Sequence, residues 1–291
     1  MKKNRLLSVA AVCLAVILVV LLMMLPKDPT LELSAPTFPS TDWTGVQTET
    51  SASTENTGNT ESVPPASTAP SVQPNRFTAS DFADQDGYMA CLSAPYQLGI
   101  DVSKYQGEID WDKVANAGIA FVIIRIGGRG YGAAGNLYAD DKAQAYYAGA
   151  KAAGLKVGAY FFSQSIQVSE AQEEAEYALE LTKDWQLDMP IVYDWEYVSE
   201  SARTANTDAE TVTACAAAFC DKIEAAGKQA MIYVRPELNK LILSELTAYA
   251  QWVALYSDQM DYPYHFDMWQ YTNTGRVPGI KGNVDIDLYM P

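Results

Sequence analysis

The residues of this chain best suited to chemistry are carboxylates at the ends of short apolar segments. In "IVYDWEYVSE" (191–200), Asp194 and Glu196 follow three β-forming residues and flank Trp195. Side chains alternate across a strand, so these two carboxylates point to the same side. Neighbouring carboxyl groups repel each other and lose hydration on burial, which is a cost in stability. The pair therefore indicates acid–base chemistry.

Further acids lie at similar places. Asp101 ends the segment "LGIDVS", and Asp285 and Asp287 alternate in "GNVDIDLY". Acids around a cleft suit glycoside cleavage, which needs one protonated donor and other carboxylates that stay ionised. A lone Asp at a strand end is more often a helix cap or turn residue, and an acidic cluster can also bind calcium. The ten or more residues between Glu196 and the next predicted helix argue against a cap.

The elements around these acids predict an irregular eight-stranded (β/α) barrel of the TIM-barrel type. Strands are expected at 98–103, 119–127, 156–163, 189–196, 229–234, 251–256, 266–271 and 282–289. Helices are expected at 110–118, 140–154, 169–185 (capped by Ser169) and 207–227 (capped near Thr207). Alternating strands and helices favour parallel βα units, and the last three strands leave little room for helices. Active sites of such barrels lie at the carboxyl ends of the strands, and the first and eighth strands are neighbours. Asp101 and Asp285 should therefore be close.

Aromatic residues are frequent at the predicted strand ends, where they could stack on the apolar faces of sugars. They are Tyr105, Tyr160, Phe162, Trp195, Tyr197, Tyr233, Tyr256, Trp269 and Tyr271. The glycine-rich "GGRGYG" (127–132) lacks the Lys-Ser/Thr of a phosphate-binding loop and is predicted to be a flexible loop beside the cleft. His265 is the only histidine, so a serine-type triad or a His-rich metal site is not expected. We expect no metal and no cofactor.

Charge and cysteine content argue against several classes of partner and site. The 20 Lys and Arg residues are outnumbered by 36 Asp and Glu residues, which argues against binding nucleic acid. The spacing of Cys13, Cys91, Cys215 and Cys220 indicates neither a zinc site nor a disulfide framework. Cys91 could pair with Cys215 or Cys220 in an oxidising compartment; free buried thiols are the alternative.

The N-terminal segment predicts a membrane anchor. Lys2, Lys3 and Arg5 precede an apolar run from Leu6 to Leu25, about the length that spans a bilayer. No small-residue cleavage site follows, so an uncleaved signal-anchor at 1–25 is favoured over a cleaved signal peptide and secretion. The positive residues should stay in the cytoplasm and the rest of the chain outside. Residues 26–94 then form a Ser/Thr/Pro-rich linker and lead-in, and 95–291 the catalytic domain.

Four segments resemble the glycoside hydrolase family 25 lysozymes, the Chalaropsis-type N-acetylmuramidases. They are "GIDVSKYQGEIDWDKVANAGIAFVIIRIGGRGYG", "GLKVGAYFFS", "PIVYDWE" and "MWQYTNTGRVPGIKGNVDIDLY", in the family's order and spacing over about 96–291. The resemblance implies cleavage of the β-1,4 bond between N-acetylmuramic acid and N-acetylglucosamine in peptidoglycan. It implies that Glu196 is the catalytic acid, with a pKa raised by burial and by Asp194, and that Asp194 orients the substrate's 2-acetamido group.

The resemblance also implies that Asp101 and Asp285 complete the catalytic set. Predicted substrate contacts are Tyr160, Trp195, Tyr256, Trp269, Tyr105, Arg125 and Asp287. The family often has Asn where Asp287 stands and His where Phe161 stands. Substrate assistance by the acetamido group is favoured over a covalent enzyme nucleophile. We expect a monomer; the alternative functions are an inactive wall-binding module and a chitinase-like glycosidase.

Overall fold

The computed structural model describes residues 72–236 and 240–291. The predicted anchor at 1–25 and most of the predicted linker lie outside these residues. Among the helices of the described segments, none is long and apolar enough to cross a membrane.

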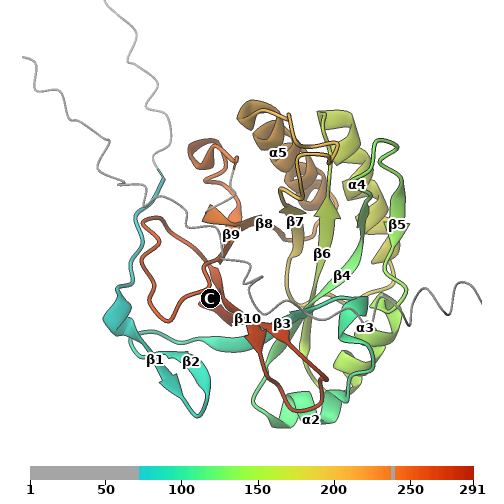
Figure 1. Ribbon diagram of the computed structural model, residues 1–291. Coiled ribbons are helices and arrows are strands. Elements are labelled where there is room, and N and C mark those ends of the chain that lie inside the picture. The colour runs from blue at the N-terminus through green and yellow to red at the C-terminus, as the bar shows by residue number, and fades with distance from the viewer. Residues whose placement is uncertain (1–71, 237–239) are drawn as a thin grey trace, which may run out of the picture. The chain divides into compact units, whose positions relative to one another are not determined.

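Eight strands form a closed barrel, as predicted (Figure 1). They are β3 (Gln97–Val102), β4 (Phe121–Arg129), β6 (Lys156–Ser163), β7 (Ile191–Trp195), β8 (Ala230–Val234), β9 (Ala250–Ala254), β10 (Met268–Gly275) and β11 (Val284–Tyr289). Pairing follows the order β3-β11-β10-β9-β8-β7-β6-β4, and β3 closes the barrel against β4. The short β5 (Leu137–Ala139) adds to the outer end of β4. All eight predicted strands are present, with boundaries moved by a few residues.

Strand β11 runs antiparallel to both of its neighbours, β10 and β3, whereas the other barrel strands pair in parallel. Its beginning, not its end, therefore lies beside the carboxyl end of β3. Asp285 is the direct cross-strand partner of Asp101. The predicted proximity of these two acids is confirmed, and the reversed strand is its cause.

Four helices cover one side of the barrel, as predicted: α2 (Trp111–Asn116), α3 (Ala143–Ala152), α4 (Val168–Leu181) and α5 (Ala209–Ala225). Of the two predicted caps, the one at Ser169 is wrong and the one near Thr207 is confirmed to within one residue. Ser169 lies inside α4, whose N-cap is Gln167. Helix α5 is capped by Asp208, whose carboxylate accepts a hydrogen bond from the Thr211 backbone amide. Asp at this position satisfies an amide that the first helical turn leaves unpaired.

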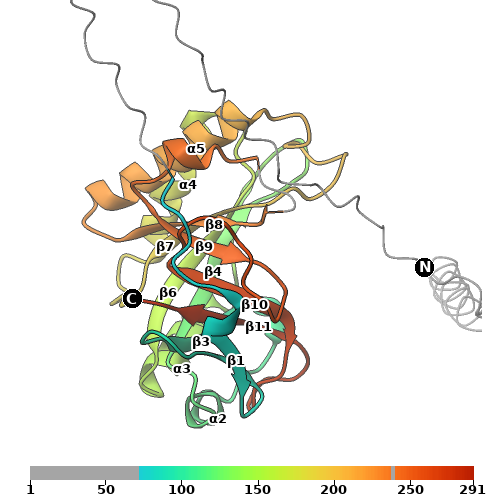
Figure 2. The same cartoon turned by 90° about the vertical axis from the view of Figure 1, so that its left-hand side faces the viewer.

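No α-helix follows β8 in the described part of the chain. The outer side of β10 and β11 is covered by residues of the lead-in instead of a helix. The lead-in contributes the hairpin β1 (Phe82–Gln85) and β2 (Tyr88–Cys91), seen beside β10 and β11 in Figure 2. Its apolar residues pack against Trp269, Leu288 and Met290. Residues 72–94, assigned from sequence to the linker and lead-in, thus pack on the barrel.

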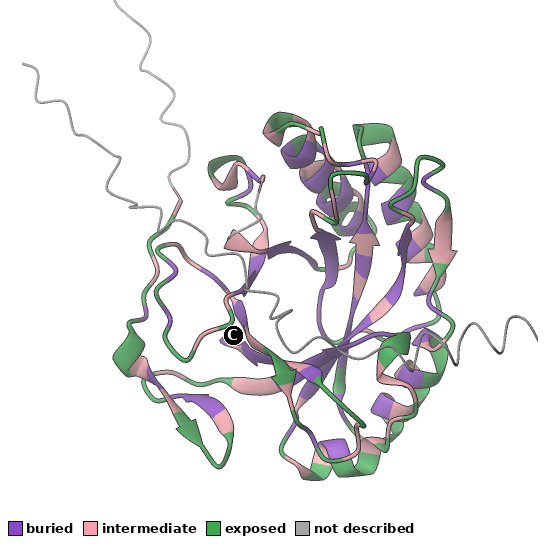
Figure 3. Ribbon diagram, viewed as in Figure 1, coloured by how far each residue is buried: buried purple, intermediate pink, exposed green. Residues whose placement is uncertain are grey.

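The barrel interior is a packed core and not a pore, because large buried side chains from its strands form one apolar cluster. Figure 3 shows that most of the barrel strands are buried. Phe121 and Trp252 belong to this cluster, and the Phe121 ring lies 2.1 Å from where a Cβ of Gly99 would stand. Only glycine fits at that point of β3. Cys91, Cys215 and Cys220 are free and buried, with Cys91 in a different apolar cluster from the α5 pair.

Candidate active site

A cleft opens where β3, β6, β7, β8 and β9 end and β11 begins. Its lining residues are Asp101, Tyr160, Asp194, Glu196, Tyr233, Trp252, Tyr256, Gln270 and Asp285. All four predicted catalytic acids are therefore brought together. The cavity volume is about 110 Å³, below the roughly 300–1,000 Å³ of sites that enclose a whole drug-sized ligand. It has room for the reacting part of a larger molecule.

Asp194 and Glu196 form one wall of the cleft. Asp194 is the penultimate residue of β7 and is 5% exposed, whereas Glu196 follows the last residue of the strand. Burial raises the pKa of Asp194 well above its usual range and the charge of Glu196 adds to this, while Arg125 and Arg235 oppose it. Burial also raises the pKa of Glu196, and Arg235, 3.4 Å away, opposes this rise. Burial is thus the main cause for Glu196, and the like-charge effect falls on Asp194.

Asp101 and Asp285 form the opposite wall, and Asp287 lies behind it without lining the cleft. Burial and the two neighbouring aspartates raise the pKa of Asp101, although the Gln270 Nε2 donates to its Oδ2 at 2.6 Å. Burial, followed by the charge of Glu196, raises the pKa of Asp285 to about 6. Asp287 is fully buried; Trp252 donates to its Oδ1 at 2.9 Å, and its Oδ2 has no hydrogen-bond partner among the described residues.

Gln270 ties the two aromatic residues of the rim to the acids. Its Oε1 accepts hydrogen bonds from the Tyr233 hydroxyl at 2.9 Å and the Tyr256 hydroxyl at 3.0 Å, while its Nε2 donates to Asp101. The amide thereby fixes two hydroxyl groups and one carboxylate in a single arrangement. Gln270, Trp252 and Arg235 were absent from the sequence-based site. A polar residue in the otherwise apolar "MWQY" was the available signal for Gln270.

Tyr160 and Tyr256 line the cleft as predicted, and Tyr233 and Trp252 extend the aromatic surface. The rings of Tyr160 and Tyr233 both pack edge-on against Trp252, with centroids 6.5 and 5.0 Å apart. Tyrosine and tryptophan rings present an apolar face together with a hydrogen-bonding tip. Such a surface suits a ligand with apolar faces and hydroxyl edges.

Two predicted substrate contacts, Trp195 and Trp269, are wrong in position. Trp195 is 5% exposed and packs in the core between sheet and helices, on the other side of β7 from the cleft. Trp269 is fully buried against the lead-in, and its Nε1 donates to the Leu255 carbonyl at 2.8 Å. Each neighbours a cleft residue in sequence, so strand alternation turns it to the opposite side.

Three further predicted contacts lie near the cleft without lining it. Arg125 is held by Asp140, with Nε at 2.8 Å and Nη2 at 2.7 Å, and lies over the Tyr105 ring at 5.0 Å. Tyr105 is 78% exposed, so it can still meet a long ligand. Asp287 lies beneath the cleft and touches Trp252.

The prediction that 127–132 is a flexible loop is wrong for its first half. Gly127, Gly128 and Arg129 belong to β4. Arg129 is 5% exposed and pairs with Glu173 and Glu174, each at 2.7 Å. The glycines allow β5 to approach, since a Cβ on Gly127 would lie 2.4 Å from the Tyr138 carbonyl oxygen.

Comparison with known proteins identifies the family. The family model for glycosyl hydrolases family 25 matches residues 100–280. The chain belongs to this family. The lead-in of this family 25 protein, including its β1–β2 hairpin, precedes the matched region.

Two curated proteins are similar in sequence. Lysozyme M1 of Streptomyces globisporus is 29% identical over 199 residues, which are 64% of this chain and 65% of that protein. The autolytic lysozyme of Clostridium acetobutylicum is 26% identical over 193 residues, which are 66% of this chain and 55% of that protein. The matched part thus spans less than two thirds of either relative.

Solved structures share the fold. A bacterial lysozyme from Streptomyces coelicolor superimposes with a TM-score of 0.54 and 26% identity, over 67% of this chain and 92% of that one. The modular autolysin LytC from Streptococcus pneumoniae, in complex with a synthetic peptidoglycan ligand, gives 0.60 and 24% identity, over 72% of this chain and 52% of that one.

Proposed function

We propose that this family 25 protein is a muramidase that hydrolyses the β-1,4 bond between N-acetylmuramic acid and N-acetylglucosamine in peptidoglycan. The observation that carries the proposal is the cleft in which Glu196, Asp194, Asp101 and Asp285 face one another. The similarity to two lysozymes, and to an autolysin that binds a peptidoglycan ligand, supports this choice of substrate.

In the proposed reaction, Glu196 protonates the leaving glycosidic oxygen. Burial keeps this carboxyl protonated at a higher pH than usual, and Arg235 stabilises the carboxylate left after transfer. Asp194 would orient and polarise the 2-acetamido group as it attacks the anomeric carbon. One oxygen of Asp194 has no partner within the described residues and is available for that contact.

The remaining lining groups would bind the sugar and balance charge. Positive charge develops on the sugar ring in the transition state of glycoside cleavage. Asp101 and Asp285 lie where a carboxylate could stabilise it, and Tyr160, Tyr233, Trp252 and Tyr256 offer surfaces for the ring. The protein would act as a monomer on glycan strands.

For localisation we propose an uncleaved anchor at residues 1–25 with the catalytic domain outside the cell. We expect the full-length protein in the membrane fraction. External protease should release the catalytic domain by cutting the exposed linker. A soluble mature chain that begins after residue 25 would favour a cleaved signal peptide instead.

The decisive experiment is mass spectrometry of peptidoglycan digested by the full-length protein. A muramidase releases fragments with muramic acid at the reducing end. Reducing-end glucosamine would assign a different bond specificity, and binding without release would indicate an inactive wall-binding module. Digestion of chitin at a comparable rate would favour the chitinase-like alternative.

A further inference from the structure

The acid Glu196 stands just beyond the regular structure that supports its neighbours. The last cross-strand pair between β6 and β7 joins Ser163 to Trp195. Gln164 and Glu196 would be the next pair, but β7 has ended. The main chain of Glu196 therefore needs support that strand pairing no longer gives.

The side chain of Gln164 supplies this support. Its Nε2 donates to the Glu196 carbonyl oxygen at 2.9 Å and to the Ser163 carbonyl oxygen at 2.9 Å. One amide group thus bridges the ends of the two strands and extends their pairing by one residue. Gln164 is fully buried, so water does not compete for these bonds.

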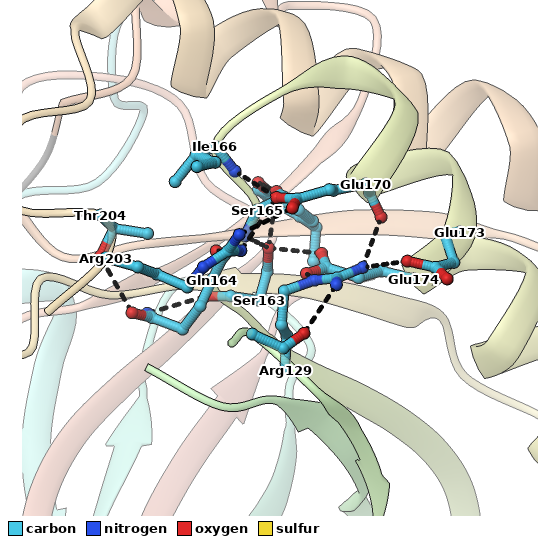
Figure 4. A network of polar contacts seen from close by, with 12 residues as sticks. Arg129, Ser163, Gln164, Ser165, Ile166, Glu170, Glu173, Glu174, Arg203 and Thr204 are labelled. Atoms are coloured by element: carbon cyan, nitrogen blue, oxygen red, sulfur yellow. Dashed lines mark hydrogen bonds and ion pairs between the residues drawn. The ribbon is translucent and has the colours of Figure 1, made fainter. Parts of the chain in front are cut away.

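Gln164 is itself fixed from the other side (Figure 4). Its Oε1 accepts from the Thr204 hydroxyl at 2.9 Å, and its backbone carbonyl accepts from Arg203 at 2.7 Å. Arg203 in turn holds both carboxylate oxygens of Glu170, at 2.9 and 2.7 Å. The orientation of the amide follows from its partners, because reversing it would face an oxygen toward two carbonyl oxygens.

We propose that Gln164 is a positioning residue for the acid: it holds the Glu196 main chain so that the carboxyl group can reach the leaving oxygen. The inference rests on the proposed function, in which Glu196 is the proton donor. A displacement of about 1 Å in a reacting group can cost on the order of 10²-fold in rate. Loss of the Gln164 amide should therefore act on the chemical step more than on substrate binding.

The first test is Gln164→Met in the full-length protein, which keeps side-chain length and removes both donors. We expect kcat on peptidoglycan to fall about 10- to 100-fold, with KM changed by no more than a few-fold. A kcat equal to the wild type in folded protein would overturn the inference.

A milder variant guards against misfolding. Thr204→Val removes only the hydroxyl that orients the Gln164 amide and should lower kcat by several-fold. Thr182→Val is the matched control: Thr182 is 1% exposed and donates to the Ala178 carbonyl in α4, an equally buried bond away from the cleft. Equal effects of Thr204→Val and Thr182→Val on kcat would show a purely structural role and overturn the inference.

The leaving group gives the sharpest readout. An aryl β-glycoside of N-acetylmuramic acid expels an acidic phenol and needs little help from a proton donor. We expect Gln164→Met to lose much less activity on this substrate than on peptidoglycan. Equal losses on both substrates would contradict a role through Glu196. If the wild-type protein releases no reducing-end muramic acid, the proposed function fails; if it does and the variants behave like the control, only the role of Gln164 fails.

Discussion

The two walls of the cleft hold the same kind of group in different electrostatic surroundings. On the β7 wall, Arg125 and Arg235 oppose the effect of burial on the pKa of Asp194, and Arg235 does so for Glu196. On the β3–β11 wall, the charge of Asp285 raises the pKa of both Asp101 and Asp287, in addition to burial. The hydrogen-bond donors found there are neutral: the Gln270 amide and the Trp252 indole.

This difference separates two tasks. A proton donor must lose and regain its proton in each cycle, which is easier where a cation stabilises the charged form. The β7 wall, with Arg235 beside Glu196, fits that requirement. The β3–β11 wall lacks such compensation within the described residues, so no cation opposes the effects of burial and like charge on the pKa of its carboxyl groups. The walls also differ outside, since helices back β7 and the hairpin backs β10 and β11.

The strongest test of the comparison is Glu196→Gln, which keeps the shape of the side chain and removes its proton. We expect activity on peptidoglycan to fall about 10²–10⁴-fold with binding of wall material retained, because general acid catalysis contributes on that scale. Digestion assays and pull-down on insoluble peptidoglycan measure the two quantities. Glu200→Gln, on the exposed segment that follows, is the control and should be neutral. Near-wild-type turnover by folded Glu196→Gln would show that Glu196 on the β7 wall is not the proton donor.

A second prediction compares the two kinds of element that pack on the outside of the barrel, the β1–β2 hairpin and helix α5. Phe82 of the hairpin is 6% exposed, and its ring packs edge-on against Trp269 at 5.0 Å. Phe82→Ala should lower the free energy of unfolding by about 3–5 kcal/mol, as for other buried phenylalanines. Phe219→Ala in the fully buried face of α5 is the counterpart on the helical side. Denaturant titrations of both variants should give similar losses; a negligible loss for Phe82→Ala would show that the hairpin is dispensable.

Much of this fold could be predicted from sequence because its signals are local. Apolar runs separated by glycine-closed helical patterns gave eight strands and four helices at the observed places. The direction of β11 is a non-local property. The sequence nevertheless contains an indication of it. Only residues 276–283 connect β10 to β11, and this segment is too short for the crossover that a parallel pair of strands needs.

The site was predictable where strand alternation was applied and missed where it was not. Alternation places Asp194 and Glu196 on one side of β7 and therefore puts Trp195 on the other, in the core. In the same way, Gln270 faces the cleft and its neighbour Trp269 does not. Aromatic residues near strand ends were chosen by type, and type alone does not tell a binding surface from a core. Arg235 follows the end of β8, beyond the reach of the strand pattern.

A third prediction concerns the partner acid on the β7 wall. If the acetamido group attacks the anomeric carbon, Asp194 is needed in the transition state more than in the ground state. Asp194→Asn should lower kcat by about 10²-fold, the scale of losing one group that stabilises a transition state, with KM within a few-fold. A thiazoline mimic of the cyclised intermediate should inhibit the wild type and bind the variant less well. Trapping of a glycosyl ester on Asp101 or Asp285 would contradict substrate assistance.

The last and smallest effect concerns stability on the opposite wall. The pKa of Asp285 is raised to about 6 in the folded protein, by burial first and then by the charge of Glu196. Its unfolded value is the ordinary 3.8. An acid whose pKa rises on folding destabilises the fold when it is ionised. The penalty is absent below the unfolded pKa, grows between the two values and is constant above the folded one.

Asp285→Asn removes that penalty and should stabilise the protein at pH 7 by up to about 3 kcal/mol, from a shift of about two pKa units. At pH 3 the variant and the wild type should unfold at the same denaturant concentration. Asp188→Asn is the control of opposite sign: burial works against the charge of Asp188, but Lys151 and the Val157 amide lower its pKa overall. That variant should lose stability at pH 7. Were Asp285→Asn destabilising at pH 7, a compensating cation would have to act on the β3–β11 wall, and the contrast between the walls would not hold.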